Sequence, residues 1–119
     1  MKHDIEEQAG ALVLRLQGRF DAASAPEIKQ LLKDQVGAGN TRIVLEISGV
    51  DFMDSSGLSV IVTCQRLAQS RGGDLRIAGA AESVKSILEL TRLSRVFELD
   101  SDVGEAISRL PPKSRKSGR

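Results

Sequence analysis

The stretch 43–58, IVLEISGVDFMDSSGL, joins a strand pattern to a helix pattern. Residues 43–47 are apolar at four of five positions and rich in β-branched side chains, which predicts a buried strand at the centre of a sheet. A helical pattern follows over 55–71, where Gly72-Gly73 ends it. One carboxylate and two hydroxyls are therefore expected at a strand-to-helix turn, on Asp54, Ser55 and Ser56.

The chemistry of this turn has two interpretations. The first N–H groups of a helix lack intrahelical partners and lie at the positive end of its dipole, so such a turn can hold an anion or present a serine to an enzyme. Alternatively, Asp54 or Ser55 is a helix cap whose side-chain oxygen accepts hydrogen bonds from those N–H groups. Local chemistry alone favours the cap.

Strand and helix patterns alternate along the rest of the chain. Apolar and more polar residues alternate over 12–17, which predicts a half-buried strand, and a short strand around Ile5 precedes it across Ala9-Gly10. Ser24-Ala25-Pro26-Glu27 matches a capping box and opens a helix that Gly37 and Gly39 end. The remaining elements are expected, in chain order, as a strand at 75–77, a helix at 84–91, a strand at 96–99 and a helix at 103–110 that Pro111-Pro112 stops.

This order predicts an α/β fold in which parallel strands are linked by crossover helices. Most strands alternate polar with apolar residues, whereas parallel strands covered on both faces are apolar throughout. We therefore expect a mixed, mostly parallel sheet of four to five strands with about four helices, mainly on one face. Residues 1–110 are expected to form this single domain, and 111–119 a basic, disordered tail.

Composition narrows the range of functions. With 40% hydrophobic and 28% charged residues, the 119-residue chain has the composition of one soluble globular domain. No apolar run is long enough to cross a bilayer, so we expect no membrane insertion. A single cysteine, Cys64, fits a core position in a protein of the reducing cytoplasm. The only aromatic residues are three phenylalanines, which argues against stacking on single-stranded nucleic acid.

The net charge of +1 is unevenly spread. The tail carries four basic residues and no acidic one, hence +4, and residues 1–110 carry 13 basic and 16 acidic residues, hence −3. A basic tail can contact nucleic acid or anionic lipid, but four charges without an aromatic or apolar anchor are more typical of a solvated end. We expect no direct contact with nucleic acid.

An enzyme is not expected. A catalytic serine needs an activating base, and in hydrolases it sits in a Gly-x-Ser-x-Gly turn. That turn is absent, and the only histidine is His3, close to the N-terminus. No Cys/His cluster suggests a metal site, and no Gly-x4-Gly-Lys-Ser/Thr loop suggests a nucleotide. We therefore expect neither a metal nor a cofactor.

Three groups of residues together carry a resemblance to a known family. They are Asp54-Ser55-Ser56-Gly57-Leu58; Gly18-Arg19-Phe20-Asp21, followed by Ala25-Pro26-Glu27; and Ser83-Val84 through Leu90-Thr91-Arg92-Leu93, with Val96-Phe97. These segments resemble the STAS domain family, specifically the bacterial anti-sigma-factor antagonists. The first is similar to the phosphorylation motif of that family, the second to its first strand-to-helix junction, and the third to its third helix and last strand. The resemblance covers nearly all of residues 1–110.

The resemblance implies a switch in which Ser55 is phosphorylated by the partner, an anti-sigma factor with serine kinase activity. The unphosphorylated antagonist binds that partner and frees the sigma factor, and a phosphatase resets the switch. Two positions depart from the family pattern, because Ser59 and Arg92 replace residues that are usually glycine. Ser59 adds bulk and a hydroxyl beside the phosphorylation motif, which bears on the identity of the partner.

A helical wheel suggests where a partner docks. Val60, Ile61, Cys64, Leu67 and Ala68 form the core stripe of the helix, and Leu58 and Val62 fall outside it. The expected partner-binding residues are Asp21, Asp54, Ser56, Gly57, Leu58, Ser59, Val62 and Arg66. The alternative is that Leu58 and Val62 form an edge of the core.

A second function remains open for a small STAS domain. The chain is alternatively a subunit of a membrane lipid-transport complex, where it binds an ATPase instead of an anti-sigma factor. The paired hydroxyls of Ser55 and Ser56 favour the phosphorylation switch. Co-purification with an ATP-binding-cassette protein would favour the transport complex.

Overall fold

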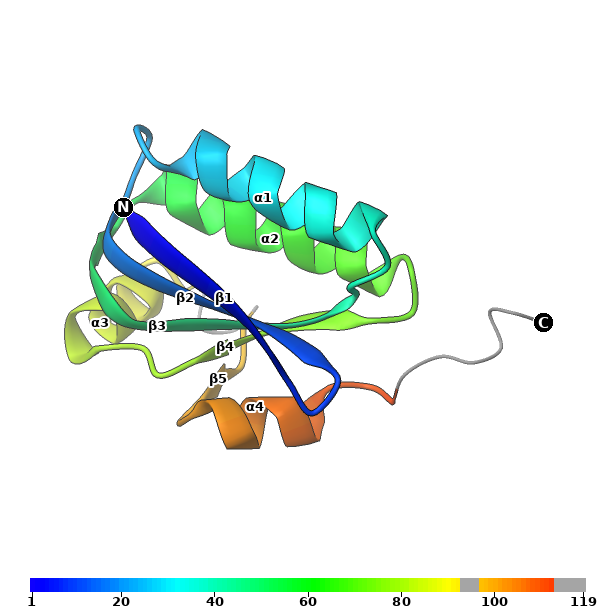
Figure 1. Cartoon of the computed structure of the whole chain (residues 1–119). Helices are drawn as coiled ribbons and strands as arrows, with labels where there is room; N and C mark the ends of the chain where they lie inside the picture. Colours follow the sequence, from blue (N-terminus) through cyan, green and yellow to red (C-terminus); the bar gives the residue numbers. More distant parts are fainter. Residues whose placement is uncertain (93–96, 113–119) are drawn as a thin grey trace.

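Five strands and four helices alternate along the chain, as a computed structural model of residues 1–92 and 97–112 shows (Figure 1). The elements are β1 (Lys2–Gln8), β2 (Ala11–Phe20), α1 (Ala25–Gly37), β3 (Arg42–Met53), α2 (Ser55–Gln69), β4 (Asp74–Ala78), α3 (Glu82–Leu90), β5 (Leu99–Asp100) and α4 (Val103–Arg109). Val96, the start of one predicted strand, and the tail residues 113–119 lie outside the described residues. The expected disorder of the tail therefore stays a prediction.

The strands form one sheet in the order β1-β2-β3-β4-β5. β1 runs antiparallel to β2, and every later pair is parallel, which confirms the predicted mixed, mostly parallel α/β sheet. The first two strands form a hairpin at the predicted Ala9-Gly10 turn. Both turn residues have positive φ, 51° and 78°, the conformation that a two-residue hairpin requires.

The two faces of the sheet are covered unequally. α1 and α2 lie side by side over one face, and α4 packs on the other (Figure 1). α3 adds Val84 and Leu88 to the larger core beneath α1 and α2, so the helices are mainly on one face, as expected. α4 covers only a small apolar cluster: Ala11, Val13, Val44, Ala78, Ala106 and Leu110.

The start of α1 differs from the predicted capping box. Ser24 precedes the helix, but its hydroxyl makes no cap hydrogen bond and instead donates to the carbonyl of Arg19 at 2.8 Å. The carboxylate of Asp21 accepts from the N–H groups of Ala23 and Ser24, at 3.1 and 3.2 Å. The prediction was wrong because an aspartate three residues earlier closes a local turn and takes the role of the serine.

Buried ions tie α4 and β5 to the sheet. The guanidinium of Arg76 in β4 donates to both carboxylate oxygens of Asp100 in β5, at 2.7 and 3.2 Å, and to Glu98 at 2.8 Å. The hydrogen bond that Arg76 donates to Asp100, and after it the one to Glu98, raise the pKa of the guanidinium against the opposing effect of burial. Arg109 of α4 approaches Asp100 at 3.6 Å. A buried pair of this kind fixes the register of a short strand, because either ion alone is costly to bury.

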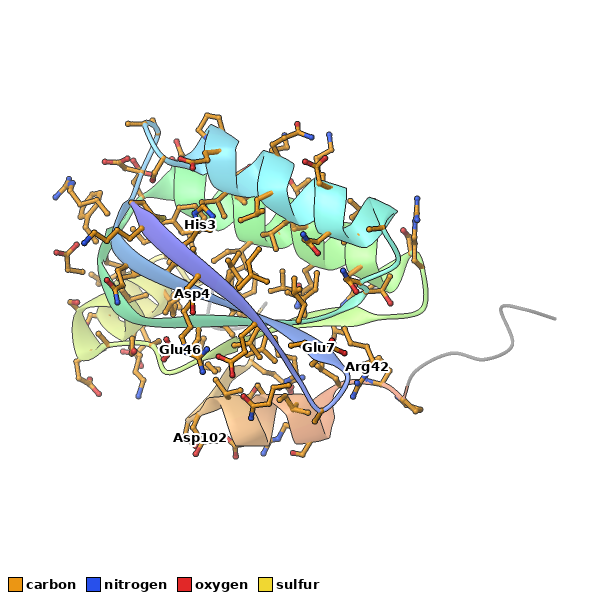
Figure 2. The ribbon with its side chains drawn as sticks, in the orientation of Figure 1. His3, Asp4, Glu7, Arg42, Glu46 and Asp102 are labelled. Atoms are coloured by element: carbon orange, nitrogen blue, oxygen red, sulfur yellow. The ribbon has the colours of Figure 1, made fainter. Side chains whose placement is uncertain are left out.

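A hydrogen bond from a side chain of β3 holds the end of the domain. Arg42 Nε, at the start of β3, donates to the carbonyl of Pro111 at 2.8 Å. Figure 2 shows Arg42 beside the point where the chain leaves α4. Pro111 is therefore anchored to the sheet, although it lies in the segment that was assigned to the tail.

Deletion of the tail is expected to reveal this boundary. Removing 113–119 takes away no apolar side chain, so we expect a change in unfolding free energy within about ±0.5 kcal/mol. Removing 111–119 also deletes the carbonyl that Arg42 uses, and costs roughly 1 kcal/mol more. Thermal melts of both truncations test this difference. Equal unfolding free energies of the two truncations would mean that the contact between Arg42 and Pro111 does not stabilise the domain.

Candidate functional site

The turn between β3 and α2 is held by Asp54. Its carboxylate oxygen accepts from the N–H groups of Ser56, at 2.8 Å, and Gly57, at 3.3 Å. This confirms the cap interpretation for Asp54. Two of the N–H groups that an external anion would need are therefore already used. Ser55 is the first helical residue, and its side chain is left on the outside of the turn.

Gly57 packs the turn against the end of β2. The N–H of Asp54 donates to the carbonyl of Phe20 at 3.3 Å. A Cβ on Gly57 would lie 2.6 Å from that carbonyl oxygen and 2.9 Å from the Phe20 ring, so only glycine fits. Gly57 is buried, and its contribution to the site is the close approach of α2 to β2, which places the Asp54 turn beside the loop after Phe20.

That loop presents a second carboxylate. Burial acts to raise the pKa of Asp21, but the N–H groups of Ser24 and Ala23 and the guanidinium of Arg19 outweigh it and lower the pKa. Asp21 is therefore an anion at neutral pH, held in a fixed orientation. Arg19 also lies over the ring of Phe52, 4.1 Å from its centroid, which joins the ends of β2 and β3.

A groove opens between the first halves of α1 and α2. It encloses about 520 Å³ and is lined by Ala22, Ala25, Pro26, Lys29, Ser55, Ser56, Ser59 and Val60. The lining thus includes three serines from α2 and one lysine from α1. The only histidine of the chain, His3, lies on β1 and is not among the lining residues (Figure 2).

The structure separates the predicted site residues into three groups. Ser55, Ser56 and Ser59 line the groove, and Ser55 and Ser59 are exposed. Asp21 and Asp54 hold the two turns beside it. Val62 and Arg66 lie farther along α2, outside the groove, with Arg66 exposed and Val62 half-buried against the core.

The structure supports the alternative interpretation of Leu58, in which it belongs to the core. Its side chain is only 6% exposed and belongs to the core cluster that includes Phe20 and Met53. The helical wheel treats the helix as an isolated cylinder with one buried stripe. In the fold, the first turn of α2 packs against the ends of β2 and β3, so a side chain outside the stripe is also covered.

The sequence alone did not reveal the α1 side of the groove. Ala22, Ala25, Pro26 and Lys29 were not among the expected site residues, yet they form half of its lining. One signal could have indicated that α1 contributes to the site. Both α1 and α2 are crossover helices expected on the same face of the sheet, so they were expected to be neighbours. Which α1 side chains meet Ser55 depends on the rotation of α1 about its axis, which the sequence pattern does not specify.

Comparisons with known proteins agree with this architecture. The STAS domain family matches residues 2–106. The anti-sigma F factor antagonist of Paenibacillus polymyxa is 25% identical over 108 residues, which are 90% of this chain and 92% of the relative. The crystal structure of a putative anti-sigma factor antagonist from Thermotoga maritima superposes with a TM-score of 0.82 at 25% identity, covering 89% of this chain and 92% of that one.

The same fold has also been solved in a phosphorylated protein. The phosphorylated form of SpoIIAA, a Bacillus cell fate determinant, superposes with a TM-score of 0.69 at 22% identity, covering 91% of this chain and 98% of that one. At this identity the likeness establishes the fold alone. Within the described residues of our chain, no helix is both long enough and apolar enough to cross a bilayer.

Proposed function

Because this chain belongs to the STAS domain family, we propose that it is an anti-sigma-factor antagonist whose binding is switched by phosphorylation of Ser55. The unphosphorylated form would bind an anti-sigma factor with serine kinase activity and release the sigma factor, and a serine phosphatase would reverse the modification. The relatives that are named as antagonists of anti-sigma factors support the partner class. The observation that carries the proposal is the exposed Ser55 hydroxyl on the rim of the groove.

Ser55 is a better phosphate acceptor than its neighbour Ser56. Ser55 is exposed at the first helical position, whereas Ser56 is half-buried and its N–H is bonded to Asp54. In the transfer, Ser55 Oγ would bond to the γ-phosphorus of ATP as the bond from that phosphorus to the β-γ bridging oxygen breaks. The hydroxyl proton would pass to a carboxylate of the kinase, and ADP would leave.

The phosphate should leave the fold intact. It would add a charge of about −1.5 to −2 at the first residue of a helix, where the positive end of the dipole favours an anion. Asp54 and Gly57 hold the turn with contacts that do not use the Ser55 hydroxyl. The switch is therefore expected to act on the surface that a partner covers, without unfolding the domain.

The proposed docking surface surrounds the groove and continues along α2. It comprises Asp21, Asp54, Ser56, Ser59, Val62 and Arg66, together with Pro26 and Lys29 on the α1 side. Gly57 and Leu58 would support this surface from beneath, because both are buried. The surface contains the carboxylates of Asp21 and Asp54, the exposed cations Lys29 and Arg66, and the half-buried Val62. Protein interfaces commonly have this composition, with polar residues around a smaller apolar centre.

A capture experiment tests the proposal. The full chain carrying Ser55→Ala is immobilised and exposed to native lysate of the source cells, and the bound proteins are identified by mass spectrometry. We expect an anti-sigma factor with a kinase fold. The wild-type chain, incubated with that protein and Mg²⁺-ATP, should then carry one phosphate, on Ser55.

The controls separate the alternatives. Ser56→Ala should still be phosphorylated, whereas Ser55→Ala should not. Phosphate on Ser56 or Thr63 with Ser55 unmodified would refute the assignment of the site. Capture of an ATP-binding-cassette protein in place of an anti-sigma factor would support the lipid-transport alternative.

A further inference from the structure

The groove brings a cation of α1 to the hydroxyls of α2. Lys29 lines it together with Ser55 and Ser59, although the two helices are separated by a whole strand in the sequence. Within residues 1–92 and 97–112, no carboxylate oxygen lies within 4 Å of the Lys29 ammonium. Lys29 is exposed, and its flexible side chain is free to turn into the groove.

The electrostatics of α2 are consistent with this proximity. Burial raises the pKa of the Cys64 thiol in α2, and the positive charges of Lys29 and Lys33 oppose that rise. The field of both lysines therefore reaches α2, but only Lys29 lines the groove. Lys33, one turn farther along α1, supplies a matched charge outside the groove.

We propose that Lys29 is the counter-ion of phosphorylated Ser55, so that its ammonium group turns into the groove and pairs with the phosphate. This inference rests on the proposed phosphorylation of Ser55. The two nearby carboxylates are committed elsewhere, because Asp54 accepts from the N–H groups of α2 and Asp21 from those of its own loop. Their negative charges oppose the phosphate, and Lys29 is the cation among the residues that line the groove.

The pairing gives the switch a second effect. In the unphosphorylated chain, Lys29 would be available to an acidic group of the partner. After phosphorylation the same lysine is held by the phosphate, so the docking surface gains an anion and loses a cation. Both changes disfavour a partner that presents carboxylates to this surface.

Phosphorus NMR on a chain that carries phosphoserine at position 55 tests the pairing directly. The modified residue is incorporated during translation, so no kinase is needed. A nearby cation lowers the second pKa of a phosphate, which is about 6 when unperturbed. Lys29→Gln is expected to raise that pKa by roughly half a unit, the size of one close charge interaction at a solvated surface.

The controls assign the shift to position and charge. Lys33→Gln, which removes the same charge one turn away, should change the pKa of the phosphate by less than a third as much. Lys29→Arg, which keeps the charge, should leave it close to that of the wild type. In about 1 M salt, where charges are screened within about 3 Å, the difference between wild type and Lys29→Gln should shrink. Equal shifts in Lys29→Gln and Lys33→Gln, or no shift in either, would overturn the pairing.

This result is separable from that of the proposed function. Phosphate transfer to Ser55 by a captured kinase tests the function, whereas the titration uses protein that was modified without a kinase. Lys29 is exposed, so its replacements should fold as the wild type does, which a thermal melt verifies.

Discussion

A phosphate on Ser55 is expected to weaken binding of the anti-sigma factor by a factor of a hundred or more. The modification places about two negative charges on the rim of a groove whose neighbours include the anionic Asp21. A docked partner must remove water from that anion, whose charge of about −1.5 to −2 exceeds the single positive charge of Lys29, and burying the uncompensated part costs several kcal/mol. Since about 1.4 kcal/mol corresponds to a tenfold change, about 3 kcal/mol accounts for the predicted factor.

Calorimetric titration with the anti-sigma factor measures this effect. Phosphorylated chain, Ser55→Ala and Ser55→Asp are compared with the wild type, in the presence of a non-hydrolysable ATP analogue so that no transfer occurs. Ser55→Ala should bind as the wild type does, and Ser55→Asp, with a single charge, should lose less affinity than the phosphate. Thermal melts should be similar for all four. Binding of the phosphorylated chain within threefold of the wild type would exclude the switch.

The arrangement of strands and helices could largely be predicted from the sequence, because the spacing of apolar residues differs between strands and helices. Alternation over 12–17 and the apolar run 43–47 correspond to β2 and β3, and glycines end α1 and α2 close to the predicted positions. Local patterns suffice where one face of an element contacts one core. The hairpin at Ala9-Gly10 was also predictable, since this turn depends on two adjacent residues.

Predictions failed where two distant elements meet. In the alternation over 12–17, Val13 falls on the same side of the strand as the polar Arg15 and Gln17, yet α4, about ninety residues later, buries it. Leu58 lies outside the helical stripe, yet the ends of β2 and β3 cover it. Ser24 satisfies the capping pattern, but the competing carboxylate of Asp21 forms a better local turn. Each outcome depends on a contact that no periodicity within one element encodes.

Only part of the candidate site could be predicted from the sequence. The Asp54 cap and the exposed Ser55 follow from the turn itself. The groove requires the packing of α1 against α2, so its α1 half, including Lys29, could be identified only in the structure. The roles of all these residues in partner binding stay predictions until the binding experiments are done.

Adjacent residues of α2 offer the sharpest test of where the core ends and the docking surface begins. Ile61 is 1% exposed at the centre of the larger core. Val62 is half-buried and packs partly against that core, although the helical wheel places it outside the core stripe. Thr63, the next residue, is exposed and supplies a matched control on the same helix.

We expect Ile61→Asp to unfold the domain or to cost more than about 4 kcal/mol of stability, because it buries an unpaired carboxylate. Val62→Asp should cost about 1 kcal/mol, since part of its apolar surface contacts the core and its carboxylate can still reach water. Thr63→Asp should stay within about ±0.5 kcal/mol. Thermal and denaturant unfolding of the three variants measure this order.

Binding measurements then test whether the exposed part of Val62 contacts the partner. If its exposed half belongs to the docking surface, Val62→Asp places a charge in the interface and should reduce affinity for the anti-sigma factor by at least tenfold, while Thr63→Asp binds normally. Calorimetric titration of the folded variants gives both values. Should Val62→Asp bind as tightly as Thr63→Asp, the valine serves only the core, and the docking surface on α2 is confined to the groove at Ser55 and Ser59.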